Sequence, residues 1–249
     1  MAKPNVAQLK RRKDVEGLIS ALQYESDDDV RADAAFALSD IKADKRALEP
    51  LIHALKDKYF LVTVGAAKAL GELEDATAVE PLIQVLLNNK RLTARSNSAV
   101  ALGQIADDKA VEPLIRTLRK DKVPEVRERA AWALREIKDK RAIGPLIQAL
   151  KDKDWDVRGE AAGALGDIGE PAVQLLIGAL KDKNGDIRWG AAAILGHIGD
   201  KRALEPLAQA LKDKKPNVRD EAARALEMIK KSKRKRLYAG CCYKILAKW

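Results

Sequence analysis

The sequence is poor in aromatic residues, cysteine and histidine, and it has no long hydrophobic run. Aromatic residues make up 4% of the 249 positions, so a core drawn from the 47% hydrophobic content must be aliphatic. No run of about 18 apolar residues occurs, and the polar start of the chain lacks the apolar segment of a secretory signal. We therefore expect a cytoplasmic protein without a membrane span.

The cysteines and histidines, which could serve in catalysis or metal binding, are few and lie at isolated positions of the sequence. Cys241 and Cys242 are adjacent, so they cannot easily close an unstrained disulfide with each other. They are interpreted as small apolar residues, with reactive thiols, lipidation or metal binding as alternatives. His53 and His197 are far apart, which leaves a zinc ion without a ligand set. No phosphate-binding Gly-x-x-x-x-Gly-Lys-Ser/Thr motif occurs. We predict no enzyme activity, no cofactor and no metal.

Positive charge is concentrated at the two ends of the chain. The formal net charge is +10, and residues 1–14 carry five Lys or Arg against one Asp. Residues 230–249 carry eight Lys or Arg and no acid, so residues 15–229 are left with about −2. The body is therefore nearly neutral, and electrostatic attraction to a polyanion is expected at the ends rather than along a groove.

A repeat of about 31 residues runs through this neutral body. The segment Pro-Leu-Ile-x-x-Leu or a close variant begins at Gly17, Pro50, Pro81, Pro113, Pro145, Leu175 and Pro206. Successive starts are 33, 31, 32, 32, 30 and 31 residues apart. Seven copies at so steady a period are the signature of a stacked repeat protein.

Each copy is interpreted as two helices joined by a short turn. In the fifth copy the first helix covers residues 142–150, and Val157, Ala161, Ala164 and Ile168 then form one apolar stripe of a second helix. One such pair cannot bury its stripe alone, so neighbours must stack. The predicted fold is an all-α solenoid with units near 14–42, 45–74, 76–106, 108–138, 140–168, 170–198 and 201–229, followed by a basic and apolar cap at 230–249.

The repeat resembles the HEAT-like repeats named after the phycobilisome lyases, in which an Asp precedes Val-Arg and then Ala-Ala-x-Ala-Leu-Gly-x-Ile. The resemblance covers about residues 15–230 and implies a structural ladder of Asp–Arg pairs between adjacent repeats. It carries over to Asp121, Asp152, Asp182 and Asp213, and to Arg31, Arg95, Arg127, Arg158, Arg188 and Arg219. Thr63 stands in an Arg position and Asn89 in an Asp position, so the ladder is expected to weaken there.

The resemblance also implies that second helices line a concave surface, where a partner would bind. Eight residues of the side opposite the apolar stripe are predicted to contact it: Phe36, Lys68, Glu128, Trp132, Gly159, Gly163, Trp189 and Arg224. Trp132 and Trp189 flank the fifth unit, where Gly159, Gly163 and Gly166 would leave a smooth strip. We predict a shallow groove with tryptophan walls. The alternative is that each tryptophan packs sideways over a neighbouring helix.

The C-terminal segment admits three interpretations: a solvated cap, a contact to RNA or DNA, and a contact to an anionic membrane or acidic protein. Its candidate polyanion-binding residues are Lys230, Lys231, Lys233, Arg234, Lys235 and Arg236. The leading functional prediction is a scaffold or adaptor that binds a protein. A nucleic-acid or ribosome-associated binder using the basic termini is the alternative, and a subunit of a bilin-lyase-like enzyme is a further one by resemblance. The high charge and few Cys and Met also suggest a thermostable protein.

Overall fold

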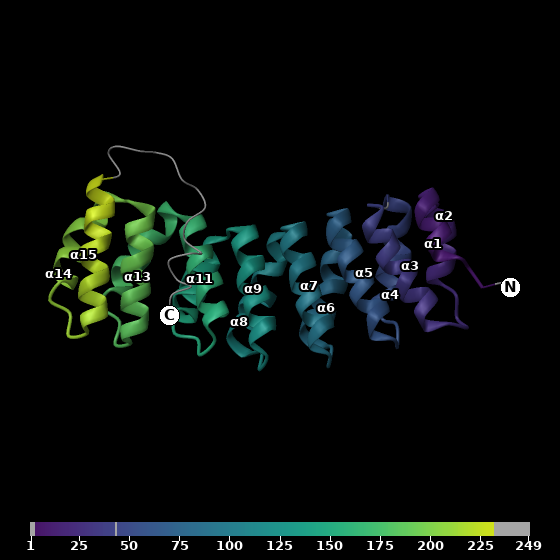
Figure 1. The fold of residues 1–249 in the computed structure, drawn as a ribbon. Helices are drawn as coiled ribbons and strands as arrows, with labels where there is room; N and C mark the ends of the chain where they lie inside the picture. Colours follow the sequence, from purple (N-terminus) through teal and green to yellow (C-terminus); the bar gives the residue numbers. More distant parts are fainter. Residues whose placement is uncertain (1–2, 43, 232–249) are drawn as a thin grey trace. The chain divides into compact units, whose positions relative to one another are not determined.

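The computed structural model describes residues 3–42 and 44–231, and every regular element in these residues is helical (Figure 1). The α-helices are α1 (Val6–Arg12), α2 (Val15–Leu22), α3 (Asp28–Asp40), α4 (Leu48–Ala54), α5 (Phe60–Leu73), α6 (Val79–Asn88), α7 (Leu92–Ile105), α8 (Val111–Lys120), α9 (Pro124–Ile137), α10 (Ile143–Ala149), α11 (Trp155–Ile168), α12 (Val173–Ala179), α13 (Gly185–Ile198), α14 (Leu204–Ala210) and α15 (Pro216–Lys231). Three-residue 3-10 helices precede six of them: η1 (Lys45–Ala47), η2 (Ala76–Ala78), η3 (Asp108–Ala110), η4 (Lys140–Ala142), η5 (Glu170–Ala172) and η6 (Lys201–Ala203).

The first helix, α1, lies outside the repeat pattern, which predicts no helix before residue 14. The side chain of Asn5 caps its start by accepting a hydrogen bond from the Gln8 N–H at 3.0 Å. Lys13, in the left-handed region with φ of 52°, ends it. α1 packs on α2 and α3, so Lys10, Arg11 and Arg12 lie on a helix that covers the first repeat.

The repeats after the first share one local construction, except that Gly169 replaces the capping aspartate before η5 and that α5, α7 and α9 begin without a side-chain cap. An aspartate such as Asp139 caps a 3-10 turn, and that turn leads directly into the first helix. Pro145 lies in the first turn of α10, where a missing N–H costs little. A Lys-Asp-Lys turn follows, and Asp154 then caps α11 by accepting hydrogen bonds from two backbone N–H groups. The two-helix repeat is therefore confirmed.

The core is aliphatic and consists of leucine, alanine, valine and isoleucine, as the shortage of aromatic residues requires. On α11 the stripe residues Val157, Ala161, Ala164 and Leu165 are fully buried. Alanine on the second helices lets neighbouring second helices pack closely, and buried leucines from both helices of each repeat complete the core. Stacking of neighbouring pairs thus buries surface that one pair would leave exposed.

The chain divides inside α8, between Thr117 and Leu118, into two compact units. In the first unit α3, α5 and α7 pack in sequence, and α4 and α6 lie against the second helices of their own repeats. In the second unit α9 packs on α11 and α13 packs on α15, while α10, α12 and α14 lie against α11, α13 and α15 respectively. The predicted all-α, α-solenoid fold is confirmed by this sequential packing.

The fifth repeat departs from the others at its end. In the fourth and sixth repeats two residues separate the second helix from the next 3-10 helix, whereas only Gly169 separates α11 from η5. Gly169 has φ of 71° and ψ of −128°, a combination that suits glycine. The shorter connection accounts for the 30-residue spacing in the sequence. α11 and α13 also pack less closely than the other adjacent second helices within each unit.

Candidate partner-binding site

The second unit forms two complete rungs of the Asp–Arg ladder. Arg127 donates from Nε and Nη2 to the two carboxylate oxygens of Asp152 at 2.8 and 2.7 Å. Arg188 holds Asp213 in the same way at 2.6 and 2.8 Å. Each aspartate also accepts a hydrogen bond from a backbone N–H of its own turn, so one carboxylate fixes the turn and joins two repeats. Burial acts to raise the pKa of Asp152, but hydrogen bonds from Arg127 and the Asp154 N–H hold it below its usual value.

The rung expected between Arg158 and Asp182 is not formed. Arg158 donates from Nη1 to the carbonyl oxygens of Asp152 and Lys153 at 2.9 and 3.1 Å, as the other ladder arginines do to their own turns. Among the described residues it makes no ion pair. Asp182 still accepts a hydrogen bond from the Asn184 N–H at 2.8 Å. The missing rung coincides with the looser packing of α11 on α13. Arg219, in the last repeat, likewise donates to the carbonyl oxygens of Asp213 and Lys214.

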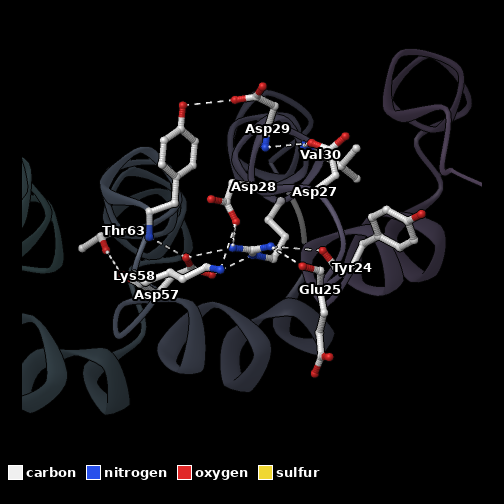
Figure 2. Close-up of polar contacts among 11 residues, drawn as sticks. Tyr24, Glu25, Asp27, Asp28, Asp29, Val30, Asp57, Lys58 and Thr63 are labelled. Carbon is white, nitrogen blue, oxygen red and sulfur yellow. Dashed lines mark hydrogen bonds and ion pairs between the residues drawn. The ribbon is translucent and has the colours of Figure 1, made fainter.

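The first unit shows how the ladder adapts where the sequence varies. Arg31 is 6% exposed and holds Asp57 through two hydrogen bonds, while Asp28 accepts a third from Nη2 at 2.6 Å (Figure 2). Thr63, in an arginine position, is buried with its hydroxyl 3.5 Å from the carbonyl oxygen of Asp57. Asn89 serves the turn by accepting a hydrogen bond from the Arg91 N–H, and Arg95 donates to the Asn89 carbonyl.

A cavity of about 220 Å³ opens where α11 and α13 separate. Trp155 and Trp189 contribute aromatic walls, and Gly159 leaves open space because nothing lies within 4 Å of a Cβ built on it. The lining is completed by Leu150, Asp152, Arg158, Ala162, Asp186 and Gly190. Trp155 is 50% exposed, the second-largest value among the exposed large hydrophobic side chains. The cavity therefore combines exposed aromatic surface with one cationic and two acidic side chains.

This cavity does not coincide with the predicted groove between Trp132 and Trp189. Trp132 does not line the cavity and is half-buried on α9. Gly163 is not part of an open strip either, because a Cβ there would lie 3.3 Å from the guanidinium of Arg135. Gly159 and Trp189 do meet at the cavity, but the second aromatic wall is Trp155. The site thus lies between the fifth and sixth repeats, near the start of both second helices.

Trp189 fits both alternatives given in the sequence analysis, since it is a wall of a cavity and also packs over a neighbouring helix. Its side chain hydrogen-bonds to Glu221 on α15, so it packs sideways over the next helix while its ring lines the cavity. Glu221 is buried, and this burial raises the pKa of its carboxyl, while Arg224 at 3.2 Å and the hydrogen bond to Trp189 act in the opposite direction. Because the indole of Trp189 is hydrogen-bonded to Glu221, its ring has a fixed orientation where it lines the cavity.

Sequence reasoning missed Trp155, although a signal was present. On a helical wheel with Val157 at zero, position 155 falls at about 160°, between positions 162 and 166 and close to Gly159. Extending the wheel by one turn towards the start of the helix therefore places Trp155 on the same side as Gly159. The looser packing of α11 on α13 has one signal in the sequence, which is the short spacing of 30 residues between the repeat starts at Pro145 and Leu175.

Glu128 and Glu160 form an acid cluster with Arg135 on the other side of α11. Burial raises the pKa of Glu160, and Arg135, with Nη1 3.7 Å from Oε2, opposes the shift. Burial likewise raises the pKa of Glu128. Arg135 also pairs with Asp167 at 2.5 Å. No group of three or more His, Cys, Asp or Glu suited to a metal ion occurs in the part of the chain that the structure describes.

The other predicted contact residues are dispersed. In the first unit Phe36 is half-buried, and Lys68 lies with Nζ 3.5 Å from Asp40. In the second unit Arg224 is exposed. Lys230 and Lys231 lie exposed at the end of α15, with Lys231 paired to Glu227 at 3.0 Å. The remaining tail predictions lie outside the described residues: Lys233, Arg234, Lys235, Arg236, Cys241 and Cys242.

The chain matches the HEAT-repeat family over residues 15–103, 61–135, 111–188 and 173–237. These segments cover most of the sequence, so the protein belongs to the HEAT-repeat family, as the residue pattern suggested. No match was found among curated proteins. Within residues 3–42 and 44–231, no helix is long and apolar enough to cross a membrane.

Many solved structures are similar in fold, and three of them illustrate the range. The complex of CpcE and CpcF of phycocyanin lyase from Nostoc sp. PCC7120 aligns at 25% identity with a TM-score of 0.56, covering 94% of this chain and 92% of that one. An engineered protein aligns at 24% identity with a TM-score of 0.52, covering 90% and 70%. The Escherichia coli protein YibA aligns at 23% identity with a TM-score of 0.53, covering 90% and 95%. The last two similarities concern the fold alone.

Proposed function

We propose that this protein is a non-catalytic scaffold or adaptor that binds a protein partner on the second-helix face of its second unit. HEAT repeats are typically used for protein binding, which supports the general class. The observation that carries the specific proposal is the cavity between α11 and α13, with Trp155 and Trp189 in its lining.

Exposed tryptophan is costly in a protein that has only four of them. Leaving the Trp155 indole half in water forgoes a hydrophobic gain that a bound partner would restore. Tryptophan is also among the residues most enriched at the energetic centres of protein interfaces, because it brings a large area with few rotatable bonds. The cavity walls therefore suit an anchor side chain of a partner.

Affinity capture from the source cell, with and without nuclease, tests this proposal. We expect a protein partner that survives nuclease treatment and is lost when Trp155→Ala and Trp189→Ala are combined. Leu175→Ala is the matched control, since Leu175 is 53% exposed on α12 and lies outside the cavity. Unchanged capture by the double tryptophan variant would contradict the proposed site. Capture that disappears with nuclease would favour the alternative of a nucleic-acid binder.

A second candidate is a subunit of a bilin-lyase-like enzyme. It is favoured by the similarity to the CpcE–CpcF complex, which spans nearly the whole of both aligned chains. Fold similarity alone does not determine activity, so this candidate ranks below the scaffold. A change in the absorbance spectrum of a free bilin on mixing with the protein would support it, and an unchanged spectrum would count against it.

A further inference from the structure

Arg158 presents hydrogen-bond donors that its counterparts use to hold an aspartate. Arg31, Arg127 and Arg188 each bind both oxygens of a carboxylate through Nε and Nη2. Arg158 has the same anchor to its own turn through Nη1. Within the described residues, its Nε and Nη2 bind no carboxylate, and its side chain lines the cavity. A guanidinium fork held in place is a ready receptor for a planar anion.

The other charges at the cavity already have partners. Both oxygens of Asp152 are held by Arg127, and one also accepts the Asp154 N–H. Asp186 lies 3.8 Å from Lys215 Nζ. Arg158 acts on Asp152 through its charge, but among the described residues it is the lining charge that makes no ion pair and no hydrogen bond to a carboxylate. The cavity thus complements an anion, not a cation.

The remaining lining complements a flat apolar group next to that anion. Trp155 and Trp189 offer ring surface, and Gly159 removes the side chain that would otherwise fill the space between them. Leu150 and Ala162 add aliphatic surface. A volume of about 220 Å³ accommodates one large side chain rather than a folded element.

We propose that this cavity binds an internal segment of a partner protein in which an Asp or Glu lies beside an aromatic or large aliphatic residue. The carboxylate of the segment accepts hydrogen bonds from Nε and Nη2 of Arg158, as Asp152 does from Arg127. The apolar side chain of the segment lies against the two tryptophans. The partner's carboxylate thereby takes the place of the Asp–Arg ion pair that is missing between the fifth and sixth repeats. This inference rests on the proposed function and adds the chemistry of the partner.

The test selects ligands without assuming their sequence. The full chain is used to select random twelve-residue peptides displayed on phage through their C-terminal ends, so that no free terminal carboxylate is present. We expect enriched peptides to carry an Asp or Glu within three residues of an aromatic or large aliphatic residue. No enrichment, or enrichment without an acid, would overturn the proposal.

An enriched peptide is then synthesised with blocked ends, and its affinity is measured by fluorescence anisotropy. Arg158→Gln should weaken binding about tenfold or more, because a hydrogen-bonded ion pair is lost. Replacing the acid of the peptide by its amide should cause a similar loss, and combining both changes should add little. Arg219→Gln is the matched control: Arg219 makes the same turn contacts but lies away from the cavity. Equal affinities for the two arginine variants would overturn the proposal.

A third variant separates blocked binding from unfolding. Gly159→Leu should abolish peptide binding by filling the cavity, while the helical circular dichroism remains that of the wild type, since a Cβ meets nothing within 4 Å. Undiminished binding by this folded variant would also contradict the proposed position.

If the double tryptophan variant loses its partner but Arg158→Gln captures the partner as well as Arg219→Gln does, this inference fails and the proposed function stands. If the tryptophan variant also retains the partner, the proposed function fails.

Discussion

At the scale of single residues, two glycines of the second unit should respond oppositely to an added methyl group. Gly159 lies inside α11 with open space around its missing Cβ, so Gly159→Ala should raise the free energy of unfolding by about 0.5–1 kcal/mol through helix propensity. In Gly196→Ala the new Cβ would lie 2.8 Å from Ala225 Cα and Cβ, and we expect a loss of about 1–3 kcal/mol. Urea unfolding of both variants measures the difference, and equal shifts would contradict the assigned packing.

The ladder gives a second residue-scale prediction, which depends on pH. Hydrogen bonds from Arg188 hold the pKa of Asp213 below its usual value near 4. Because the folded-state pKa lies below that of the unfolded chain, the rung stabilises the protein above pH ~4. This contribution is lost as the pH falls through the lowered folded-state pKa. Asp213→Asn should therefore cost about 3 kcal/mol at pH 7 and clearly less at pH 3, as measured by chemical unfolding.

Asp182→Asn is the matched control for that prediction. Both aspartates accept a backbone hydrogen bond in their own turn, which asparagine can preserve, but Asp182 makes no ion pair among the described residues. Its replacement should cost less than about 1 kcal/mol at either pH. A loss at pH 7 as large as that of Asp213→Asn would show that an Arg158–Asp182 rung exists in solution.

At the scale of elements, we attribute the cavity to the connection after α11, which is one residue shorter than the connections after α9 and α13. Replacing Gly169 by the dipeptide Lys-Asp would copy the connection found after α9, where Lys138 and Asp139 stand. We expect α13 to pack on α11, Arg158 to pair with Asp182, and the cavity to close. Tryptophan fluorescence should then shift to shorter wavelength, and peptide binding should be lost. An unchanged spectrum with retained binding would show that the shorter connection does not open the site.

The elements themselves were largely predictable because they follow from local periodicity. The apolar stripe from Val157 to Ile168 and the proline near the start of each first helix predict the helix pairs and their order. The position of the cavity was not predictable, since it depends on how far α11 lies from α13. Trp132 and Trp155 both lie away from the apolar stripe but about 80° apart on the helical wheel, and the wheel alone does not tell which ring lines a cavity.

At the scale of the whole molecule, a repeat protein unfolds first where adjacent repeats interact least. Within the second unit that position is the contact between α11 and α13. We predict that amide protons of α12 to α15 share one opening free energy in native-state hydrogen exchange, and that those of α9 to α11 share another. A single opening free energy throughout the second unit would contradict the weak interface.

We propose above all that the second-helix face of this HEAT-repeat protein binds a protein partner. Site-specific photo-cross-linking in the source cell tests this most directly, with the cross-linker placed either at Arg224 on α15 or at Ala208 on α14, both of which are exposed. We predict nuclease-resistant protein cross-links from position 224 and none from position 208. Cross-links from position 208 alone, or to nucleic acid from position 224, would contradict the claim.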